Sequence, residues 1–450
     1  MNRIAGGREL VLAGWHDPEE VFLRLFATEP WAVWLDSGQS ATTGTSMLGA
    51  GTERLVAHVP NGTVEHVRED LSVAVLPGSI LDALRFVRSG HSDDWVGWLG
   101  YEYGATLVGA PVAPGSLPDA VLLRVTDRVV FDHGTRTVTL SSGDPDWIRW
   151  ASARLAEERE PRLLAPRRGV ECTPRHTDSD YVRLVERCQE HITRGDAYQL
   201  CLTNQLRVDG VHDALSTYRR LRAASPSHHG GFLRLGDVSL VSSSPEQFLE
   251  VTVEGTVRTK PIKGTRPRGL DREDDARLRA ELLASEKERA ENLMIVDLMR
   301  NDLARVSVLG SVAVTALHRV ESYPQVHQLV STVEGRLRPG SDGLDVIEAC
   351  FPAGSMTGAP KRRAMDILYE LEGGPRGPYA GAFGVLRADG SVDLAMVIRT
   401  IVIDSTGASI GAGGGITAMS VPEEELEEAW TKAAAPLAAL GVGRPDQESR

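Results

Sequence analysis

Cysteine is scarce in this sequence, with four in 450 residues. Cys172, Cys188, Cys201 and Cys350 show none of the Cys-x-x-Cys spacing that zinc sites use. Cys188 shares a predicted apolar helical face with Tyr181. We therefore expect reduced thiols in the core, with neither a structural disulfide nor a zinc site.

Long apolar segments are also missing. No run of about eighteen apolar residues occurs, which is the length that a membrane-spanning helix needs. The first nine residues lack the apolar core of a secretory signal peptide. These absences predict a soluble, cytoplasmic protein.

Positive charge is in the minority, with 49 lysines and arginines against 62 aspartates and glutamates and a formal net charge of −13. Nucleic acids and anionic membranes select net basic surfaces, so we expect neither as a partner. The phosphate-loop spacing GxxxxGK[ST] is absent, and no dinucleotide fingerprint occurs. An anionic substrate must therefore meet a local basic site.

Tryptophan is unevenly placed, since seven of the eight precede residue 151. This asymmetry and the length predict two units, an N-terminal region at 1–159 and a second domain at 178–450. Between them, residues 160–177 contain three prolines and several arginines and are interpreted as an exposed connector. In the second domain, short alternating segments predict an antiparallel sheet, near 231–235, 238–242, 247–253 and 256–259.

The segment Thr259–Gly269 reads TKPIKGTRPRG. Its two prolines and Gly264 predict a shaped loop that holds the Lys263 amine at a defined point. The other cations would raise the local positive potential, favour neutral Lys263 and make it a nucleophile. A solvated basic loop is the alternative. These other cations are Lys260, Arg266 and Arg268.

Two Glu-x-x-Glu pairs, Glu288 with Glu291 and Glu425 with Glu428, lie on predicted helices, where residues three apart share a face. Brought together, the two faces would form an oxygen site suited to Mg²⁺. Alternatively, Glu288 caps its helix and the second pair belongs to a solvated acidic run.

Two glycine-rich turns are candidates for binding the carboxylates of a small substrate. Gly354–Gly358 precedes a helix, whose N-terminus favours anions, and Gly413–Gly415 permits a close approach of the backbone. Arg399 and Lys432 are possible ion partners. Each also has a structural interpretation, since Arg399 could form a salt bridge and Lys432 could only support Glu428.

The second domain contains a set of distinctive motifs, namely GDAYQ (195–199), SPEQF (244–248), PIKGT (261–265), AENLMIVDLMRNDL (290–303), the 354–361 turn, IRT (398–400) and GGGI (413–416). Through these motifs, residues 178–440 resemble the chorismate-utilising enzymes, and within that family component I of the aminodeoxychorismate synthases. The N-terminal region contains WLDS (34–37) and GWLGY (97–101), through which it resembles the more variable part of the same family.

The resemblance implies an α+β fold of two packed antiparallel sheets flanked by helices. It implies that Glu291 and Glu428 bind Mg²⁺ directly, with Glu288 and Glu425 acting through water. Glu246 matches the general acid that helps the 4-hydroxyl of chorismate to leave. The implied substrate contacts are Gln199, Ser355, Thr357, Tyr379, Arg399, Gly413, Gly414, Gly415 and Lys432.

Lys263 distinguishes the branches of the family, because anthranilate synthases typically have alanine there. The lysine implies attack at C2 and a covalent adduct that ammonia displaces at C4, giving 4-amino-4-deoxychorismate for para-aminobenzoate and folate. Gln199 agrees, since enzymes of the family that activate water generally carry lysine at its position. The alternatives are anthranilate synthase component I and a non-catalytic chorismate-binding regulator.

Two positions depart from the family pattern. Gln328 stands where a histidine is common, with His327 one place earlier, and on a strand that shift would turn the imidazole to the opposite face. Met419 replaces a common aspartate, for which we have no explanation.

Ammonia requires a source. No cysteine has the glycine-flanked elbow of a class I amidotransferase, so the resemblance implies a separate glutamine amidotransferase subunit as partner.

Overall fold

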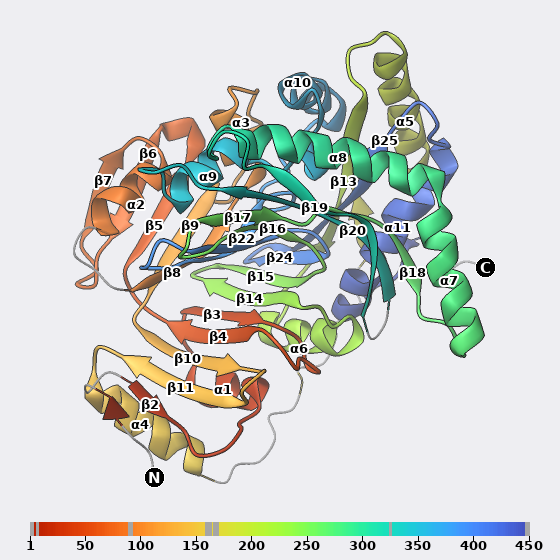
Figure 1. Ribbon diagram of the computed structural model, residues 1–450. Coiled ribbons are helices and arrows are strands. Elements are labelled where there is room, and N and C mark those ends of the chain that lie inside the picture. Colours follow the sequence, from red (N-terminus) through yellow and green to blue (C-terminus); the bar gives the residue numbers. More distant parts are fainter. Residues whose placement is uncertain are drawn as a thin grey trace.

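The computed structural model describes residues 4–5, 9–88, 93–157, 164, 171–323 and 326–445. Their strands form two large sheets, and helices cover the outer faces of both (Figure 1). Most of the predicted connector lies outside the described residues, as does Arg159, where the N-terminal region was expected to end. No helix within the described ranges combines the length and apolar character needed to cross a bilayer.

The first sheet has 13 strands in the described chain, in the order β1-β2-β11-β10-β4-β3-β14-β15-β24-β25-β13-β12, with β21 beside β13. Neighbouring strands are antiparallel throughout. The strands are β1 (Ile4–Ala5), β2 (Glu9–Val11), β3 (Trp31–Asp36), β4 (Thr45–Ala50), β10 (Asp127–Asp132), β11 (Thr137–Ser142), β12 (Cys172–Pro174), β13 (Gln199–Asp209), β14 (His229–Leu235), β15 (Val238–Ser244), β21 (Gly358–Ala359), β24 (Thr400–Asp404) and β25 (Gly407–Ile416).

The second sheet has 12 strands in the same described residues, in the order β18-β20-β17-β16-β23-β22-β8-β9-β5-β6-β7, with β19 beside β20. It is also antiparallel. The strands are β5 (Arg54–His58), β6 (Thr63–Val67), β7 (Val73–Pro77), β8 (Asp94–Leu99), β9 (Ala120–Val125), β16 (Gln247–Val251), β17 (Thr256–Thr259), β18 (Ile262–Pro267), β19 (Ala313–Ser322), β20 (Val326–Arg336), β22 (Ala382–Leu386) and β23 (Val392–Met396).

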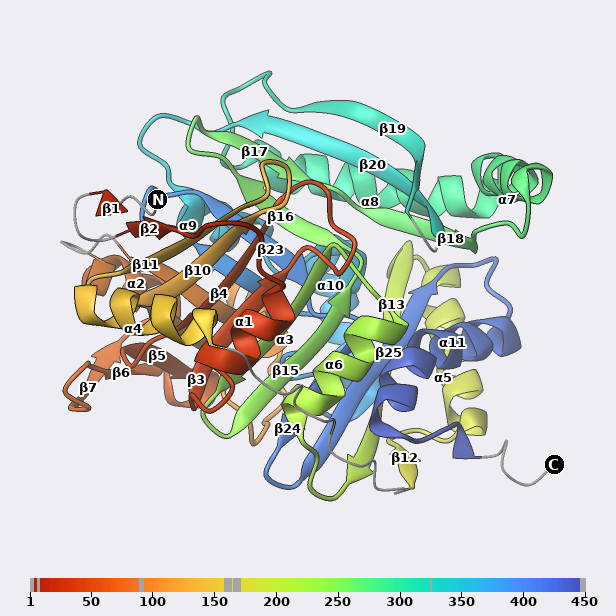
Figure 2. The ribbon, with the colours of Figure 1, turned by 90° about the horizontal axis from the view of Figure 1, so that it is seen from below.

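The helices form the two outer layers, and Figure 2 shows α1, α4 and α6 lying across the 13-stranded sheet. Helix α8 begins at Glu286, directly after its N-cap Ser285. The helices are α1 (Pro18–Leu25), α2 (Ile80–Arg88), α3 (Tyr101–Leu107), α4 (Pro145–Ala156), α5 (Asp178–Thr193), α6 (Ala214–Ala224), α7 (Arg272–Ala284), α8 (Glu286–Ala304), α9 (Gly343–Cys350), α10 (Lys361–Glu372) and α11 (Pro422–Leu440), with 3-10 turns η1 (Val59–Asn61) and η2 (Gly354–Met356).

The apolar core is divided by the layers. One cluster, which includes Val33, Trp98 and Phe383, fills the space between the two sheets. Because the strands are apolar on both faces, further clusters lie between the sheets and their helices, one at the 12-stranded sheet and two at the 13-stranded sheet. Layers of helix, sheet, sheet and helix confirm the α+β class implied by the sequence.

Both sheets combine strands from the two halves of the sequence. Trp34 of β3 lies opposite Phe232 of β14, and Gly97 of β8 lies opposite Gly384 of β22. The predicted boundary at 160–177 thus divides the sequence without dividing either sheet. The division of the chain into two units, at 1–159 and 178–450, remains a prediction.

Candidate active site

A cavity of about 1650 Å³ opens at the ends of β13, β18 and β25 and beside α8 and α11. Most of the predicted site residues line it, although they come from elements up to 186 positions apart (246 to 432). The lining includes Glu246, Lys263, Glu288, Glu291, Ser355, Tyr379, Arg399, Gly413, Gly414, Gly415, Glu428 and Lys432.

Lys263 lies in strand β18 at a β-bulge, so the expectation of a shaped loop is wrong at this position. Ile262 pairs with Val330 of β20 and Thr265 pairs with Gln328, so three steps along β18 match two along β20. The extra residue interrupts the ladder and re-aims the neighbouring side chain. Here it directs the Lys263 amine into the cavity.

Gly264 makes this bulge possible. Its φ is +83°, and a Cβ there would lie 2.8 Å from both Glu288 Cδ and Leu282 Cδ1. We expect Gly264→Ala to lower the free energy of unfolding by about 2–4 kcal/mol, through backbone strain and overpacking. Gly255→Ala is the matched control, since Gly255 has a φ of +80° but its Cβ would only reach Leu337 at 3.6 Å. If urea unfolding showed the same loss of unfolding free energy for Gly264→Ala and Gly255→Ala, the overpacking explanation would be wrong.

Lys263 keeps its proton more tightly than the sequence suggested. Burial lowers the pKa of its ammonium, but nearby anionic groups, Glu291 first, raise the pKa above its ordinary value. The Lys263 Nζ to Glu291 Oε2 distance is 3.8 Å. The flanking cations do not oppose this effect, because each has its own carboxylate. These pairs are Lys260 with Glu321 at 4.0 Å, Arg266 with Glu281 at 3.0 Å and Arg268 with Asp275 at 2.7 Å.

Glu246 is buried in the cavity wall, just before β16. Burial raises the pKa of its carboxyl group to about 7, although Lys263 and a hydrogen bond from Ser355 work in the opposite direction. A carboxyl that is partly protonated near neutral pH can donate a proton to a leaving group. Its position beside Lys263 therefore suits a general acid.

The four glutamates of the predicted metal site converge from α8 and α11, and each faces a cation. Burial raises the pKa of Glu291, whereas the ammonium of Lys432 holds the pKa of Glu428 below its ordinary value despite burial. The closest pairs are Glu291 with Lys263 at 3.8 Å, Glu425 with Lys287 at 3.3 Å, Glu428 with Lys432 at 2.6 Å and Glu288 with Arg266 at 3.6 Å.

These carboxylates fit a divalent cation by donor type and by the space beside them. A Cβ at Gly414 would lie 2.9 Å from Glu425 Oε2 and 3.6 Å from Glu428 Oε1, so the glycine leaves room next to both. In the part of the chain described, no three acidic, histidine or cysteine side chains form a ready-made cage. The cations at the glutamates would have to give way to a metal ion.

Arg399 meets the requirement for a local basic site. Its guanidinium lines the cavity, and no ion pair with a carboxylate is present among the described residues. Burial lowers its pKa, which indicates an unfavourable environment for a charge without a counter-ion. An anionic ligand would supply the counter-ion that Arg399 lacks.

Tyr379, another residue of the cavity lining, packs its ring against Gly411, where a Cβ would lie 2.1 Å from Tyr379 Cγ.

Two predicted substrate contacts do not line the cavity. Thr357 is fully buried, and its hydroxyl donates to the carbonyl oxygens of Ala353 and Gly354 at 3.2 and 3.3 Å. Its hydroxyl holds the turn that presents Ser355, and the substrate contact of Thr357 stays a prediction. Gln199 lies behind Gly415, and its amide has no hydrogen-bond partner in the described chain.

One of the two positions that depart from the family pattern, Gln328, also lies at the cavity. Gln328 lines it, whereas the imidazole of His327 points away and contacts Ser322 at 2.8 Å and Asp275 at 3.0 Å. The predicted reversal of faces is confirmed. His327 is therefore not available to a ligand in the cavity.

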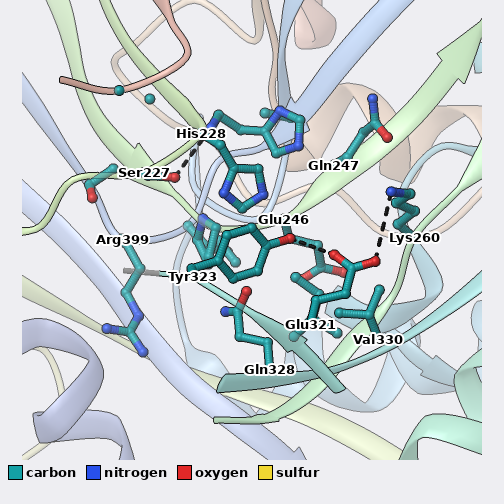
Figure 3. A pocket seen from close by; sticks show the side chains of 18 of the residues that line it. Ser227, His228, Glu246, Gln247, Lys260, Glu321, Tyr323, Gln328, Val330 and Arg399 are labelled. Carbon is teal, nitrogen blue, oxygen red and sulfur yellow. Dashed lines mark hydrogen bonds and ion pairs between the residues drawn. The ribbon is translucent and has the colours of Figure 1, made fainter. Parts of the chain in front are cut away.

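The structure adds residues that the sequence interpretation missed. Figure 3 shows His228 stacked on Tyr323, with ring centroids 4.4 Å apart, and the Tyr323 hydroxyl directed toward Glu321. No local pattern joins these positions, which are 95 residues apart. Lys287 could have been found, because it directly precedes Glu288 at the start of a predicted helix.

Comparison with known proteins agrees with this geometry. The family described as "chorismate binding enzyme" matches residues 17–438. Anthranilate synthase component I from Streptococcus pneumoniae has a similar solved structure, with a TM-score of 0.76 and 30% identity, covering 88% of this chain and 93% of that one.

Curated relatives with two different names come from Streptomyces. The chain is 40% identical to aminodeoxychorismate synthase of Streptomyces griseus over 466 residues, which is 96% of this chain but only 64% of the relative's length. It is 42% identical to anthranilate synthase component 1 of Streptomyces coelicolor over 370 residues, 77% of this chain and 72% of that protein. The alignments thus point to one family and to two activities within it.

Proposed function

The chain belongs to the family of chorismate binding enzymes, and from the site we propose that it converts chorismate and ammonia to 4-amino-4-deoxychorismate. The observation that carries the proposal is the Lys263 bulge, which places a primary amine in the cavity beside Glu291 and the buried carboxyl of Glu246. The name of the Streptomyces griseus relative supports the same activity.

The chain's residues can perform the chemistry in two steps. Lys263 first passes its proton to a neighbouring carboxylate. Its neutral amine then forms a bond to C2 of chorismate, the ring double bond shifts, and the C4–oxygen bond breaks. Glu246 donates the proton with which the 4-hydroxyl leaves as water. Ammonia then attacks C4, the double bond shifts back, and the bond from C2 to Lys263 breaks. The net reaction exchanges the hydroxyl for an amine and releases one water.

The remaining lining residues bind and orient the substrate. Arg399, Tyr379 and Ser355 are assigned to its carboxylates, together with the backbone of Gly413–Gly415. Glu291 and Glu428 would hold Mg²⁺ directly, and Glu288 and Glu425 through water. When bound, Mg²⁺ would supply a Lewis acid for the ring carboxylate of the substrate.

Ammonia would come from a glutamine amidotransferase partner. All four cysteines are buried thiols, which is unsuited to nucleophilic attack on glutamine. The proposal places the reaction in the cytoplasm, in para-aminobenzoate and folate biosynthesis. The chain alone is then expected to use ammonium salts and not glutamine.

Product analysis tests the proposal. The purified chain is incubated with chorismate, Mg²⁺ and ammonium, and the products are separated by chromatography and identified by mass spectrometry. 4-Amino-4-deoxychorismate supports the proposal. Anthranilate would instead support the second candidate, an anthranilate synthase component I, which the names of the Streptomyces coelicolor and Streptococcus pneumoniae proteins favour. Tight binding without consumption of chorismate would indicate a regulator.

The pKa of Glu246 predicts the pH dependence. The reaction needs Glu246 protonated and Lys263 neutral. Because the pKa of Lys263 is raised above its ordinary value, kcat/KM should rise with pH up to the folded Glu246 pKa of about 7 and level off above it, where the loss of protonated Glu246 offsets the gain of neutral Lys263. The folded pKa of Glu246 lies above its ordinary value of 4.5, so Glu246 contributes fully to stability when the pH is below 4.5. This contribution is lost as the pH rises through about 7.

Glu246→Gln should lower kcat by about 10²–10⁴-fold and remove the change of slope near pH 7 from the profile. Glu102→Gln provides the control, because burial raises the pKa of Glu102 to about 7 as well, although it lies outside the cavity lining. If the change of slope near pH 7 persists in Glu246→Gln, the titration belongs to another group.

A further inference from the structure

The carbonyl oxygen of Pro261 joins three elements just before the Lys263 bulge. It accepts hydrogen bonds from the Ser331 amide of β20 at 3.2 Å and from Asn292 Nδ2 of α8 at 3.4 Å. Pro261 has no N–H group, so this carbonyl is the backbone atom through which it can be anchored. The chain entering β18 is thus fixed to a strand and a helix at one atom.

Asn292 and Ser331 also bind each other. Both side chains are fully buried, and the Ser331 hydroxyl donates to Asn292 Oδ1 while accepting the His318 amide at 3.0 Å. Every polar atom of the Asn292 side chain therefore has a partner. Removing one buried partner leaves the other without a hydrogen bond, which costs about 1–3 kcal/mol.

This group lies behind the cavity wall. Gln328 and Val330 of β20 line the pocket (Figure 3), and side chains alternate along a strand, so Ser331 points to the opposite face, where it meets α8. Neither Asn292 nor Ser331 lines the cavity. Any effect on the reaction must therefore pass through residues that do.

The neighbours of the bonded residues are the chemically important ones. Glu291 directly precedes Asn292, and Lys263 follows Pro261 by two residues. Few backbone dihedrals separate the shared hydrogen bonds from the Lys263 amine and the Glu291 carboxylate, which lie 3.8 Å apart. An error of about 1 Å in such an arrangement can cost about a hundredfold in rate.

We propose that Asn292 and Ser331 are positioning residues, which set the distance between Lys263 and Glu291 by sharing the Pro261 carbonyl. The link to catalysis rests on the proposed function, in which both residues serve one reaction. The distance itself does not depend on that function.

Zero-length cross-linking measures this distance without turnover. A carbodiimide joins an amine to a carboxylate only where they touch, so chelator-treated protein should yield a Lys263–Glu291 amide that tandem mass spectrometry can quantify. The test variants are Asn292→Asp, which replaces the donor to Pro261 with an oxygen, and Ser331→Ala, which removes only the hydroxyl. The controls are Ser331→Thr, which keeps a hydroxyl, and Ser307→Ala, since the buried Ser307 hydroxyl has no partner in the described residues.

We expect the cross-link yield to fall at least about fivefold in both test variants and to stay within about twofold of wild type in both controls. For amination, kcat should fall at least about tenfold in the test variants while KM for chorismate changes less than about twofold. Wild-type cross-linking in folded Asn292→Asp and Ser331→Ala, or no cross-link in the wild type, would overturn the proposal. If the cross-links follow this pattern but the wild type does not aminate chorismate, the positioning role stands and the proposed function fails.

Discussion

Lys263→Ala is expected to lower the yield of 4-amino-4-deoxychorismate at least about a hundredfold, because the variant lacks the amine that would form the proposed covalent adduct. With C2 no longer occupied by the lysine, ammonia is expected to add there and give 2-amino-2-deoxyisochorismate. The two products have the same mass, so chromatography or NMR must separate them. Intact-protein mass spectrometry should detect the chorismate-derived adduct in wild type and not in the variant.

Lys260→Ala is the matched control for this experiment. Lys260 lines the same cavity three residues earlier, but its ammonium faces Glu321 at 4.0 Å and lies away from the four-glutamate site. Its removal should leave the position of amination unchanged. Equal yields of 4-amino product from Lys263→Ala and wild type would show that the covalent role is wrong.

Glu291→Gln is expected to weaken Mg²⁺ binding at least about a hundredfold and to lower turnover by a similar factor. An amide keeps the size of the side chain but supplies a neutral oxygen, and Mg²⁺ prefers anionic oxygen ligands. Titration calorimetry with chelator-treated protein measures the affinity directly, apart from any effect on the reaction. Glu428→Gln should behave in the same way, since it contributes the corresponding carboxylate from α11.

Glu427→Gln is the control for the metal experiment. Glu427 is the neighbour of Glu428 on α11, but its carboxylate is exposed and pairs with Arg444 at 2.8 Å. It removes the same charge from the same helix without touching the cavity. If all three variants bound Mg²⁺ as wild type does, the glutamates would not be the metal site.

The sequence predicted those features that depend on local patterns. The two Glu-x-x-Glu pairs lie on helices as predicted. Three of the four glutamates, Glu288, Glu291 and Glu428, line the cavity together with Lys263, Glu246 and Arg399. Their convergence could be inferred only from the family resemblance, because α8 and α11 are separated by more than a hundred residues. The fold class likewise came from the resemblance together with the alternating strands.

The errors arose where contacts between distant segments decide the outcome. The segment around Lys263 is a bulged strand because β20 pairs with it, and its flanking arginines are neutralised by carboxylates of α7. The hydroxyl of Thr357, which is predicted to bind the substrate, is also used by the glycine-rich turn that surrounds it. Nothing within a short window of sequence distinguishes these cases.

The interleaving of strands from both halves also limits how this chain can be redesigned. Trp34 of β3 borders β14, and Gly97 of β8 borders β22, so removal of the first 159 residues would strip one neighbour from each of two central strands. The backbone N–H and C=O groups at these exposed edges would be unpaired and could bond to strands of other chains, which favours aggregation. The first third of the sequence therefore cannot be replaced as an independent unit. A shortened catalytic chain would need new strands in place of β3 and β8.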